Sequence, residues 1–215
     1  MEQQATAAGN TVLVVDDDAS LREALHSLLR SVGYDVRLFD SVQALLDHDD
    51  FAEAGCLVLD VRLPGQSGLE LQRMLTIAGV SLPIVFITGH GDVPMSVAAM
   101  KAGAIEFLTK PFRDQDLLDA VQRGMDLSRC RHAEIAALSG LRRRFAALSA
   151  REREVMALVC SGKMNKQIAA ELQLSEITVK VHRGKVMRKM QAHSLPELVR
   201  LADRLAAAAP AAPKA

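Results

Sequence analysis

The chain has 215 residues, which is room for two modest domains, and its formal net charge is zero. This balance conceals a division, because residues 1–125 carry 9 Lys and Arg against 18 Asp and Glu, a net charge of −9. Residues 126–215 carry 17 against 8, a net charge of +9. An acidic half followed by a basic half suggests a metal or phosphate site in the first and a nucleic-acid surface in the second.

The sequence lacks the features of membrane, exported and disulfide-rich proteins. No apolar stretch reaches transmembrane length, and residues 1–10 have neither the basic start nor the apolar middle of a signal peptide. The three cysteines are widely spaced and form neither a disulfide framework nor a zinc-binding pattern. We therefore expect a cytoplasmic protein with no membrane partner.

Strand and helix patterns alternate five times between Thr11 and about Met125. Short β-branched runs separated by helical stretches are typical of buried parallel strands in an α/β sheet. The expected strands are residues 12–15, 35–39, 56–59, 84–87 and 104–109, and the expected helices are about residues 20–32, 42–48, 69–78, 93–102 and 114 onward. This order predicts a doubly wound, five-stranded parallel sheet of the flavodoxin-like type.

Polar residues mark where these helices are expected to begin. Ser20 and Glu23 form a capping-box pattern for the first helix, and Asp18 is a further candidate for a helix cap. Asp92 is expected to cap the fourth helix, and Asp114 to begin the fifth.

Four of the expected strands end on residues suited to phosphoryl chemistry. Asp16 and Asp17 follow the first strand, Asp60 the third, Thr88 the fourth and Lys110 the fifth. In such sheets ligands bind beyond the carboxyl ends of the strands. These side chains are therefore expected to converge on one site that combines an acid cluster, a lone aspartate, a hydroxyl and an ammonium.

The residue types of this site predict a specific chemistry. Several carboxylates side by side repel one another, and Mg²⁺ relieves that repulsion while also binding phosphate. Asp60 is then free to act as a nucleophile, because carboxylates form aspartyl-phosphates. Lys110 and Thr88 would contact the phosphoryl oxygens, and a cis bond before Pro111 would aim the lysine inward.

The basic half is expected to be helical throughout. Residues 117–148 contain no proline and are expected to continue the fifth helix into a linker, and four short helices follow. Their expected caps are Ser149 with Glu152, Asn165, Ser175, and Ser194 with Glu197. The tight connection before Ser175 predicts a helix-turn-helix unit.

Residues 176–190 have the pattern of a DNA-recognition helix. Val179, His182, Val186 and Met190 recur at helical spacing and are expected to face the core. The side expected to enter the major groove consists of Thr178, Lys180, Val181, Gly184, Lys185 and Arg188.

The residues of that outer side suit different parts of DNA. Val181 would contact a thymine methyl group, and Lys180 would reach guanine or phosphate. Lys166, Lys185 and Arg188 are expected to contact phosphates, which position a protein without reading sequence. Gly184 costs about 1 kcal/mol in a helix interior, which indicates either close approach of the backbone to DNA or one base contact fewer.

The acidic half closely resembles the receiver domain of two-component response regulators. The matching stretches are Val14-Val15-Asp16-Asp17, Leu57-Val58-Leu59-Asp60, Leu63-Pro64-Gly65-Gln66-Ser67-Gly68, Phe86-Ile87-Thr88 and Lys110-Pro111-Phe112. The resemblance implies that Asp60 accepts phosphate from a sensor histidine kinase. It also implies that Asp17, Asp60 and the backbone carbonyl of Arg62 bind Mg²⁺, with Asp16 bound through water. Thr88 would be the switch hydroxyl, and Phe107 the aromatic residue that changes rotamer with it.

The basic half resembles the LuxR-type helix-turn-helix. The matches are Leu148 to Glu152, Asn165-Lys166-Gln167-Ile168-Ala169, and Ser175 to Arg183. Together the two halves resemble response regulators of the FixJ and NarL type, and look closest to the FixJ branch, which includes regulators of styrene degradation. The expected organisation is a disordered N-terminus (1–10), a receiver (11–125), a helical linker (126–147), a LuxR-type domain (148–205) and a disordered tail (206–215).

This resemblance implies a transcription factor rather than an enzyme. Phosphorylation of Asp60 would promote homodimerisation and promoter binding, and an activator would also contact RNA polymerase. One alternative is that phosphorylation instead relieves autoinhibition of the DNA-binding domain. A phosphatase of the haloacid dehalogenase type is a poor fit, because such enzymes carry a second aspartate at the position of Arg62.

Overall fold

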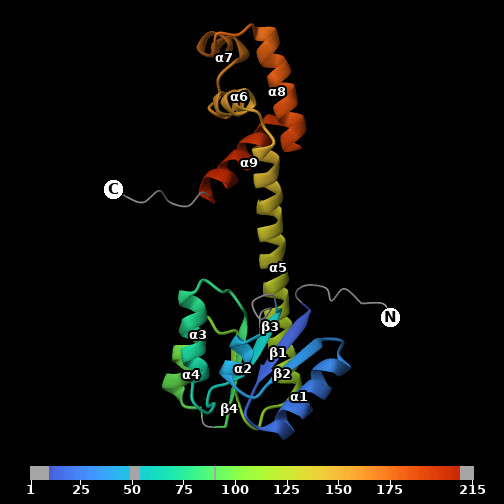
Figure 1. Cartoon of the computed structure of the whole chain (residues 1–215), viewed down its shortest axis with the longest axis vertical. Helices are drawn as coiled ribbons and strands as arrows, with labels where there is room; N and C mark the ends of the chain where they lie inside the picture. The colour runs from blue at the N-terminus through green and yellow to red at the C-terminus, as the bar shows by residue number, and fades with distance from the viewer. Residues whose placement is uncertain (1–9, 49–53, 90, 209–215) are drawn as a thin grey trace. The chain divides into compact units, whose positions relative to one another are not determined.

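The computed structural model describes residues 10–48, 54–89 and 91–208 and divides into two compact units, Met1–His132 and Ala133–Ala215 (Figure 1). Residues 1–9 and 209–215, which make up most of the ends predicted to be disordered, lie outside the described residues. Within the described ranges, no helix is both long and apolar enough to span a membrane.

The first unit is built on a five-stranded, fully parallel sheet in the order β2-β1-β3-β4-β5. The strands are β1 (Thr11–Val15), β2 (Asp35–Phe39), β3 (Cys56–Asp60), β4 (Ile84–Thr88) and β5 (Glu106–Thr109). The register pairs Val15 with Leu59, and Thr88 with Thr109. The carboxyl ends of these strands therefore lie at one edge of the sheet, and the predicted flavodoxin-like fold is confirmed.

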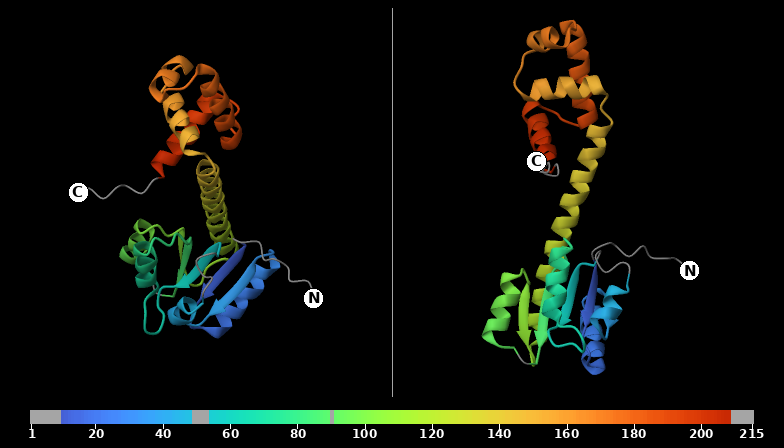
Figure 2. Two further views of the ribbon diagram at one scale, coloured as in Figure 1. Left: turned by 45° about the horizontal axis from the view of Figure 1, so that its top comes forward. Right: turned by 60° about the vertical axis from the view of Figure 1, so that its left-hand side comes forward.

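Helices cover both faces of this sheet (Figure 2). They are α1 (Ala19–Ser31), α2 (Val42–Leu46), α3 (Gly68–Ile77), α4 (Val93–Lys101) and the start of α5 (Asp114–Ala146). Side chains alternate along each strand, so Leu59 packs with α2, α3 and α4 while its neighbour Val58 packs with α1 and α5. Burial on both faces explains why the three central strands, β1, β3 and β4, are nearly continuous apolar runs.

The beginning of α1 differs from one of the two predictions made for it. The Asp18 carboxylate accepts hydrogen bonds from the backbone N–H groups of Ser20 and Leu21, at 2.8 and 3.3 Å. Asp18 is therefore the cap, as one prediction had it, and the predicted capping box from Ser20 is wrong. Because Asp18 already satisfies these donors, the helix begins before Ser20, which lies in its first turn. The predicted cap of α4 is confirmed, since Asp92 accepts from the Met95 N–H at 2.7 Å.

The second unit is entirely helical within the described residues. It contains the end of α5, α6 (Ala150–Cys160), α7 (Asn165–Leu172), α8 (Glu176–Met190) and α9 (Leu195–Ala207). Helix α8 packs against both α6 and α7 (Figure 1). The core of this unit includes Leu141 of α5 together with Val155, Ile168, Val179 and Val186 of these three helices. This arrangement agrees with the predicted helix-turn-helix unit.

The helix ends in this unit agree with the sequence except at two places. Ser149 with Glu152 forms the predicted capping box, and Ser175 caps α8. Asn165 does not cap α7 but is its first residue, because its Oδ1 accepts from Arg183 Nη1 at 3.1 Å. The other difference is at the C-terminal end, where α9 continues to Ala207, so its last residues lie in the predicted tail.

Candidate functional site

Three aspartates meet at the carboxyl edge of the sheet. Asp16 and Asp17 follow β1, and Asp60 ends β3. One carboxylate oxygen from each lies within 4.8 Å of the others. Asp16 is fully buried and Asp60 nearly so, whereas Asp17 is exposed and can meet an incoming group. The predicted convergence of these acids is therefore present.

Lys110 is the counter-charge of the two buried acids. It follows β5, the Lys110–Pro111 peptide is cis, and Nζ lies 2.6 Å from Oδ2 of Asp16 and 2.6 Å from Oδ2 of Asp60. Burial favours the neutral form and would lower the pKa of Lys110, but its hydrogen bonds and ion pairs with both acids raise the pKa above its usual value. The ammonium is therefore charged at neutral pH.

The remaining oxygens of the buried acids are held by backbone groups. Asp60 Oδ1 accepts from the N–H of Arg62 at 2.9 Å, and Asp16 Oδ1 accepts from the N–H of Asp18 at 2.9 Å. Burial raises the pKa of the Asp16 carboxyl more than its hydrogen bonds with Lys110 and Asp18 lower it. Arg22 also donates to the Asp16 carbonyl oxygen at 2.6 Å, a contact that the sequence pattern did not predict.

Thr88 and Phe107 lie beside each other in a tightly packed group at the ends of β4 and β5. Thr88 is fully buried, and the Phe107 ring packs on Phe86 with 6.2 Å between centroids. A Cβ added to Gly91 would lie 2.8 Å from Phe107 Cε1 and 3.1 Å from Thr88 Cγ2. Gly91 is therefore part of the site's packing, although its role was not predicted.

A second glycine lies against the backbone of Asp60. A Cβ added to Gly68, the first residue of α3, would lie 2.4 Å from the Asp60 carbonyl oxygen. Only glycine lets α3 begin this close to β3. The preceding loop was matched as a motif, but this contact depends on helix-to-strand packing that no single residue pattern contains.

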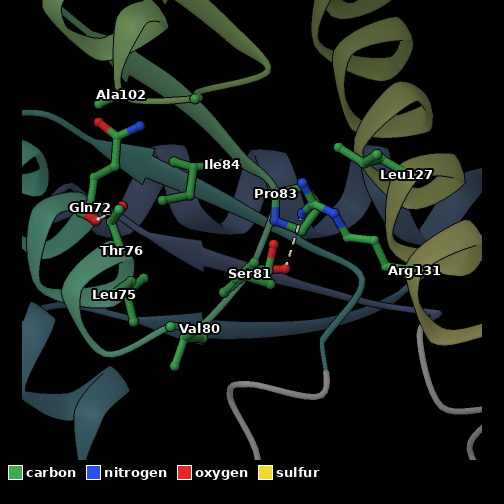
Figure 3. A pocket seen from close by; sticks show the side chains of 13 residues that line it. Gln72, Leu75, Thr76, Val80, Ser81, Pro83, Ile84, Ala102, Leu127 and Arg131 are labelled. Atoms are coloured by element: carbon green, nitrogen blue, oxygen red, sulfur yellow. Dashed lines mark hydrogen bonds between the residues drawn. The ribbon is translucent and has the colours of Figure 1, made fainter. Parts of the chain in front are cut away.

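A separate cavity of about 280 Å³ opens at the opposite edge of the sheet (Figure 3). Pro83 lies beside it just before β4 begins, whereas Thr88 ends the same strand. Two of the polar side chains that line it bond to backbone carbonyl groups: Gln72 Nε2 donates to that of Ala99 and Arg131 Nη1 to that of Ser81, each at 3.2 Å. None of the predicted site residues lines this cavity.

Helix α8 separates an inner side from an outer side as expected. Val179, Val186 and Met190 are buried, and His182 is half-buried beside them. The predicted outer residues Lys180, Val181, Gly184, Lys185 and Arg188 are exposed, as is Lys166 on α7. Thr178 is half-buried, and its hydroxyl lies 2.8 Å from Ser175 Oγ, where it supports the start of the helix.

Two other cations of α8 are engaged within the unit. Arg183 bonds to Asn165 on α7, and Lys189 Nζ lies 2.6 Å from Glu152 Oε2 on α6. The hydrogen bond from Lys189 is the main cause that lowers the pKa of the Glu152 carboxyl. These contacts hold α8 against α6 and α7. Arg183 and Lys189 therefore position the helix, whereas the cations of the outer side are exposed.

Ile177 is an outer residue that sequence reasoning did not select. Its side chain is 77% exposed in the first turn of α8, and Val181 is 51% exposed one turn later. The available signal was the i, i+4 spacing of two β-branched apolar residues on the side opposite the core.

Comparisons with known proteins agree with both halves of this description. Residues 12–122 match the response regulator receiver domain, and residues 146–202 match the luxR family of bacterial regulatory proteins. The chain is 52% identical to nodulation protein W of Bradyrhizobium diazoefficiens over 90% of this chain and 86% of that protein. It is 47% identical to the transcriptional regulatory protein FixJ of the same species over 90% and 94%.

A solved structure supports the same conclusion. The response regulator StyR is 51% identical, with a TM-score of 0.82 over 90% of this chain and 98% of that chain. The predicted resemblance to FixJ-type regulators is thus confirmed. The chain belongs to the response regulators that join a receiver domain to a LuxR-type DNA-binding domain.

Proposed function

We propose that a sensor histidine kinase phosphorylates Asp60 and that this controls binding of the second unit to promoter DNA. The observation that carries the proposal is the Asp60 carboxylate, held by the Arg62 N–H and by the Lys110 ammonium 2.6 Å away. A carboxylate oriented by two donors beside further acids suits phosphoryl acceptance better than a purely structural role.

The acid cluster fits a hard divalent cation, because its donors are carboxylate oxygens within 4.8 Å of one another. Asp17, Asp60 and the carbonyl of Arg62 would hold Mg²⁺ directly, with Asp16 acting through water, and the bound ion would offset the charge of the incoming phosphoryl oxygens. Asp17 is the exposed member and would gain the most from this partner.

In the transfer step, one Asp60 oxygen attacks the phosphorus of the kinase phosphohistidine. The P–O bond forms as the P–N bond breaks, and the electron pair leaves on the imidazole nitrogen, which takes up a proton. The Lys110 ammonium would then pair with the new phosphoryl oxygens instead of the carboxylate. The Thr88 hydroxyl would donate a hydrogen bond to one of these oxygens. We propose a switch rather than a turnover enzyme, since Arg62 stands where the haloacid dehalogenase type has its second acid.

The outer side of α8 supplies the DNA-binding role. Its exposed residues face away from the core and suit the major groove, with Lys180 and Val181 reading bases and Thr178 supporting the helix start. Lys166, Lys185 and Arg188 suit phosphate contacts. Gly184 has nothing within 4 Å of an added Cβ, so nothing inside the described unit requires a glycine there.

Homodimerisation would couple the two roles. When Thr88 moves toward the phosphoryl group, Phe107 would fill the space beside it and remodel the surface of α4, β5 and α5. Val97 and Met100 on α4 are 44% and 43% exposed, which supports this surface as the one that pairs. Two paired receivers would bring two DNA-binding units to a promoter with two half-sites. As an activator the dimer would also contact RNA polymerase. Because promoter DNA and RNA polymerase would be its partners, the protein would act in the cytoplasm.

Mass spectrometry with acetyl phosphate and Mg²⁺ tests the phosphoryl site. The wild-type chain is expected to gain one phosphoryl group, and Asp60→Asn is expected to gain none. Asp17→Asn keeps the nucleophile and should label more slowly at low Mg²⁺, while retaining the fold. Labelling of Asp60→Asn at the wild-type level would overturn the assignment.

Sedimentation of both forms at micromolar concentration tests dimerisation. The expected result is a monomer without phosphate and a dimer with it. Equal mass in both states, together with tighter DNA binding, would instead support relief of autoinhibition.

A further inference from the structure

The outer side of α8 has an apolar centre over its first two turns, with a lysine on each flank, and its central row ends on Arg188. Ile177, Val181, Gly184 and Arg188 follow one another at i, i+4, i+7 and i+11, so they form a single row along the helix. The row lies opposite Val179 and Val186 of the core. Its first two side chains are 77% and 51% exposed.

Such a row is unusual for a solvated helix, because no described residue covers it and polar side chains would cost nothing there. Lys180 and Lys185 flank it on opposite sides, both exposed, in a half of the chain whose net charge is +9. Cations on both sides of an apolar strip match a groove whose walls are phosphates and whose floor carries methyl groups.

We propose that Ile177 determines specificity together with Val181 by contacting thymine C5-methyl groups in the major groove. This inference rests on the proposed binding of promoter DNA and names what that surface reads. The methyl of thymine is the one apolar group that a base edge presents in the major groove. Neither side chain carries a hydrogen-bonding atom, so they cannot read the donor and acceptor pattern of guanine or cytosine.

The spacing of the pair predicts more than one thymine. Residues four apart are about 6 Å apart along a helix axis. Successive base pairs rise about 3.4 Å. Ile177 and Val181 therefore reach different base pairs, and each half-site should contain at least two contacted thymines. Gly184 continues the row without a side chain, so the apolar contacts of the row come from Ile177 and Val181.

Deoxyuridine substitution provides the test, because it removes only the thymine methyl. A preferred duplex is first selected from a random-sequence DNA library with the full-length protein, acetyl phosphate and Mg²⁺. Each thymine is then replaced in turn, and affinity is measured by fluorescence anisotropy. Replacement of a contacted thymine should weaken wild-type binding about fourfold per methyl group. Ile177→Ala should bind the thymine and deoxyuridine duplexes equally at one such position.

Lys185→Ala is the matched control on the same helix. It should weaken both duplexes by the same factor and reduce the dependence of affinity on salt. Ile177→Val, which keeps a branched apolar side chain, should retain most of the thymine preference. Ile177 and Lys185 are exposed, so their variants are expected to fold like the wild type, and circular dichroism checks this.

Two results would overturn the inference, and a third would overturn the proposed function on which it rests. If Ile177→Ala keeps the full difference between thymine and deoxyuridine, Ile177 does not read the methyl group. If the variant binds DNA more tightly without phosphodonor and with unchanged preference, the apolar pair is a contact for another protein surface. If the phosphorylated wild type selects no duplex, the proposed DNA-binding function itself fails.

Discussion

The acidic site of the first unit and the outer side of α8 differ in where their charges find partners. Asp16 and Asp60 are buried, and both bond to Lys110 at 2.6 Å. Lys180 and Lys185 are exposed, and no ion pair joins them to any residue that the structure describes. The two buried acids therefore find their counter-charge on folding, whereas the exposed lysines of the helix surface gain partners only when it binds. Removal of the buried counter-charge Lys110 should therefore alter the isolated protein, whereas removal of the exposed lysines should alter only complexes.

Lys110→Met should produce the largest change in the free energy of unfolding. It leaves two buried carboxylates without a counter-charge, and loss of one partner of such a pair costs about 3 kcal/mol. Added Mg²⁺ should restore part of the lost stability by binding the same acids. The measurement is urea unfolding followed by the fluorescence of Tyr34, the single tyrosine in a chain without tryptophan, which reports on the first unit.

Exposed Lys101 on α4 offers the matched control for that substitution. Lys101→Met should change the free energy of unfolding by less than about 0.5 kcal/mol. Equal stability of Lys110→Met and the wild type would break the comparison, because the acidic site would then not depend on its internal counter-charge.

Lys180→Ala and Lys166→Ala test the DNA-binding surface of the second unit. Lys180→Ala should reduce discrimination between selected and random duplexes by roughly 1–3 kcal/mol if the side chain reads a base. Lys166→Ala should weaken both duplexes equally and reduce the salt slope by about 1. Anisotropy titrations at several salt concentrations distinguish them. Loss of non-specific affinity alone in both variants would contradict the assignment of the recognition helix.

Lys189 of α8 resembles Lys110 in pairing with a buried acid, and the pH dependence of stability tests its role. Its hydrogen bond lowers the pKa of Glu152, so the folded state holds that proton more weakly than the unfolded state. The resulting stabilisation is present above the ordinary value of 4.5 and is lost as pH falls through the lower folded pKa. Glu152→Gln, which keeps a capping side chain, should melt earlier than the wild type at pH 7, and the difference should shrink as pH falls below 4.5. A pH-independent difference in circular-dichroism melts would refute this.

Gly184→Ala should have the smallest effect on the protein itself. An added Cβ meets nothing within 4 Å, so the substitution should stabilise α8 by up to about 1 kcal/mol through helix propensity. Its DNA affinity decides between the two explanations of this glycine. Weaker binding indicates close backbone approach to DNA, and unchanged binding indicates a missing contact.

Features that depend on one segment's pattern could be predicted from the sequence. The strand ends at Asp60, Thr88 and Lys110 lie together because parallel strands align their carboxyl ends, which alternation of strand and helix already implies. The inner side of α8 followed in the same way from helical periodicity, with Val179 and Val186 buried as expected.

Side-chain contacts between distant segments that no regular pattern implies could not be predicted. Asn165 has the residue type of a cap, but its side chain is occupied by Arg183 of another helix. The close approaches of Gly68 to Asp60 and of Gly91 to Phe107 exist only after the elements pack. Local preference cannot include such partners, because they are brought together by the tertiary fold.

The central claim is that phosphorylation of Asp60 controls DNA binding by the second unit. Its most direct test is the affinity of the full-length chain for a selected duplex, with and without acetyl phosphate in the presence of Mg²⁺. The wild type should bind roughly 5- to 150-fold more tightly once phosphorylated. Asp60→Asn should show no change. An equal gain in Asp60→Asn, or no gain in wild-type protein whose phosphorylation has been verified by mass, would contradict the account.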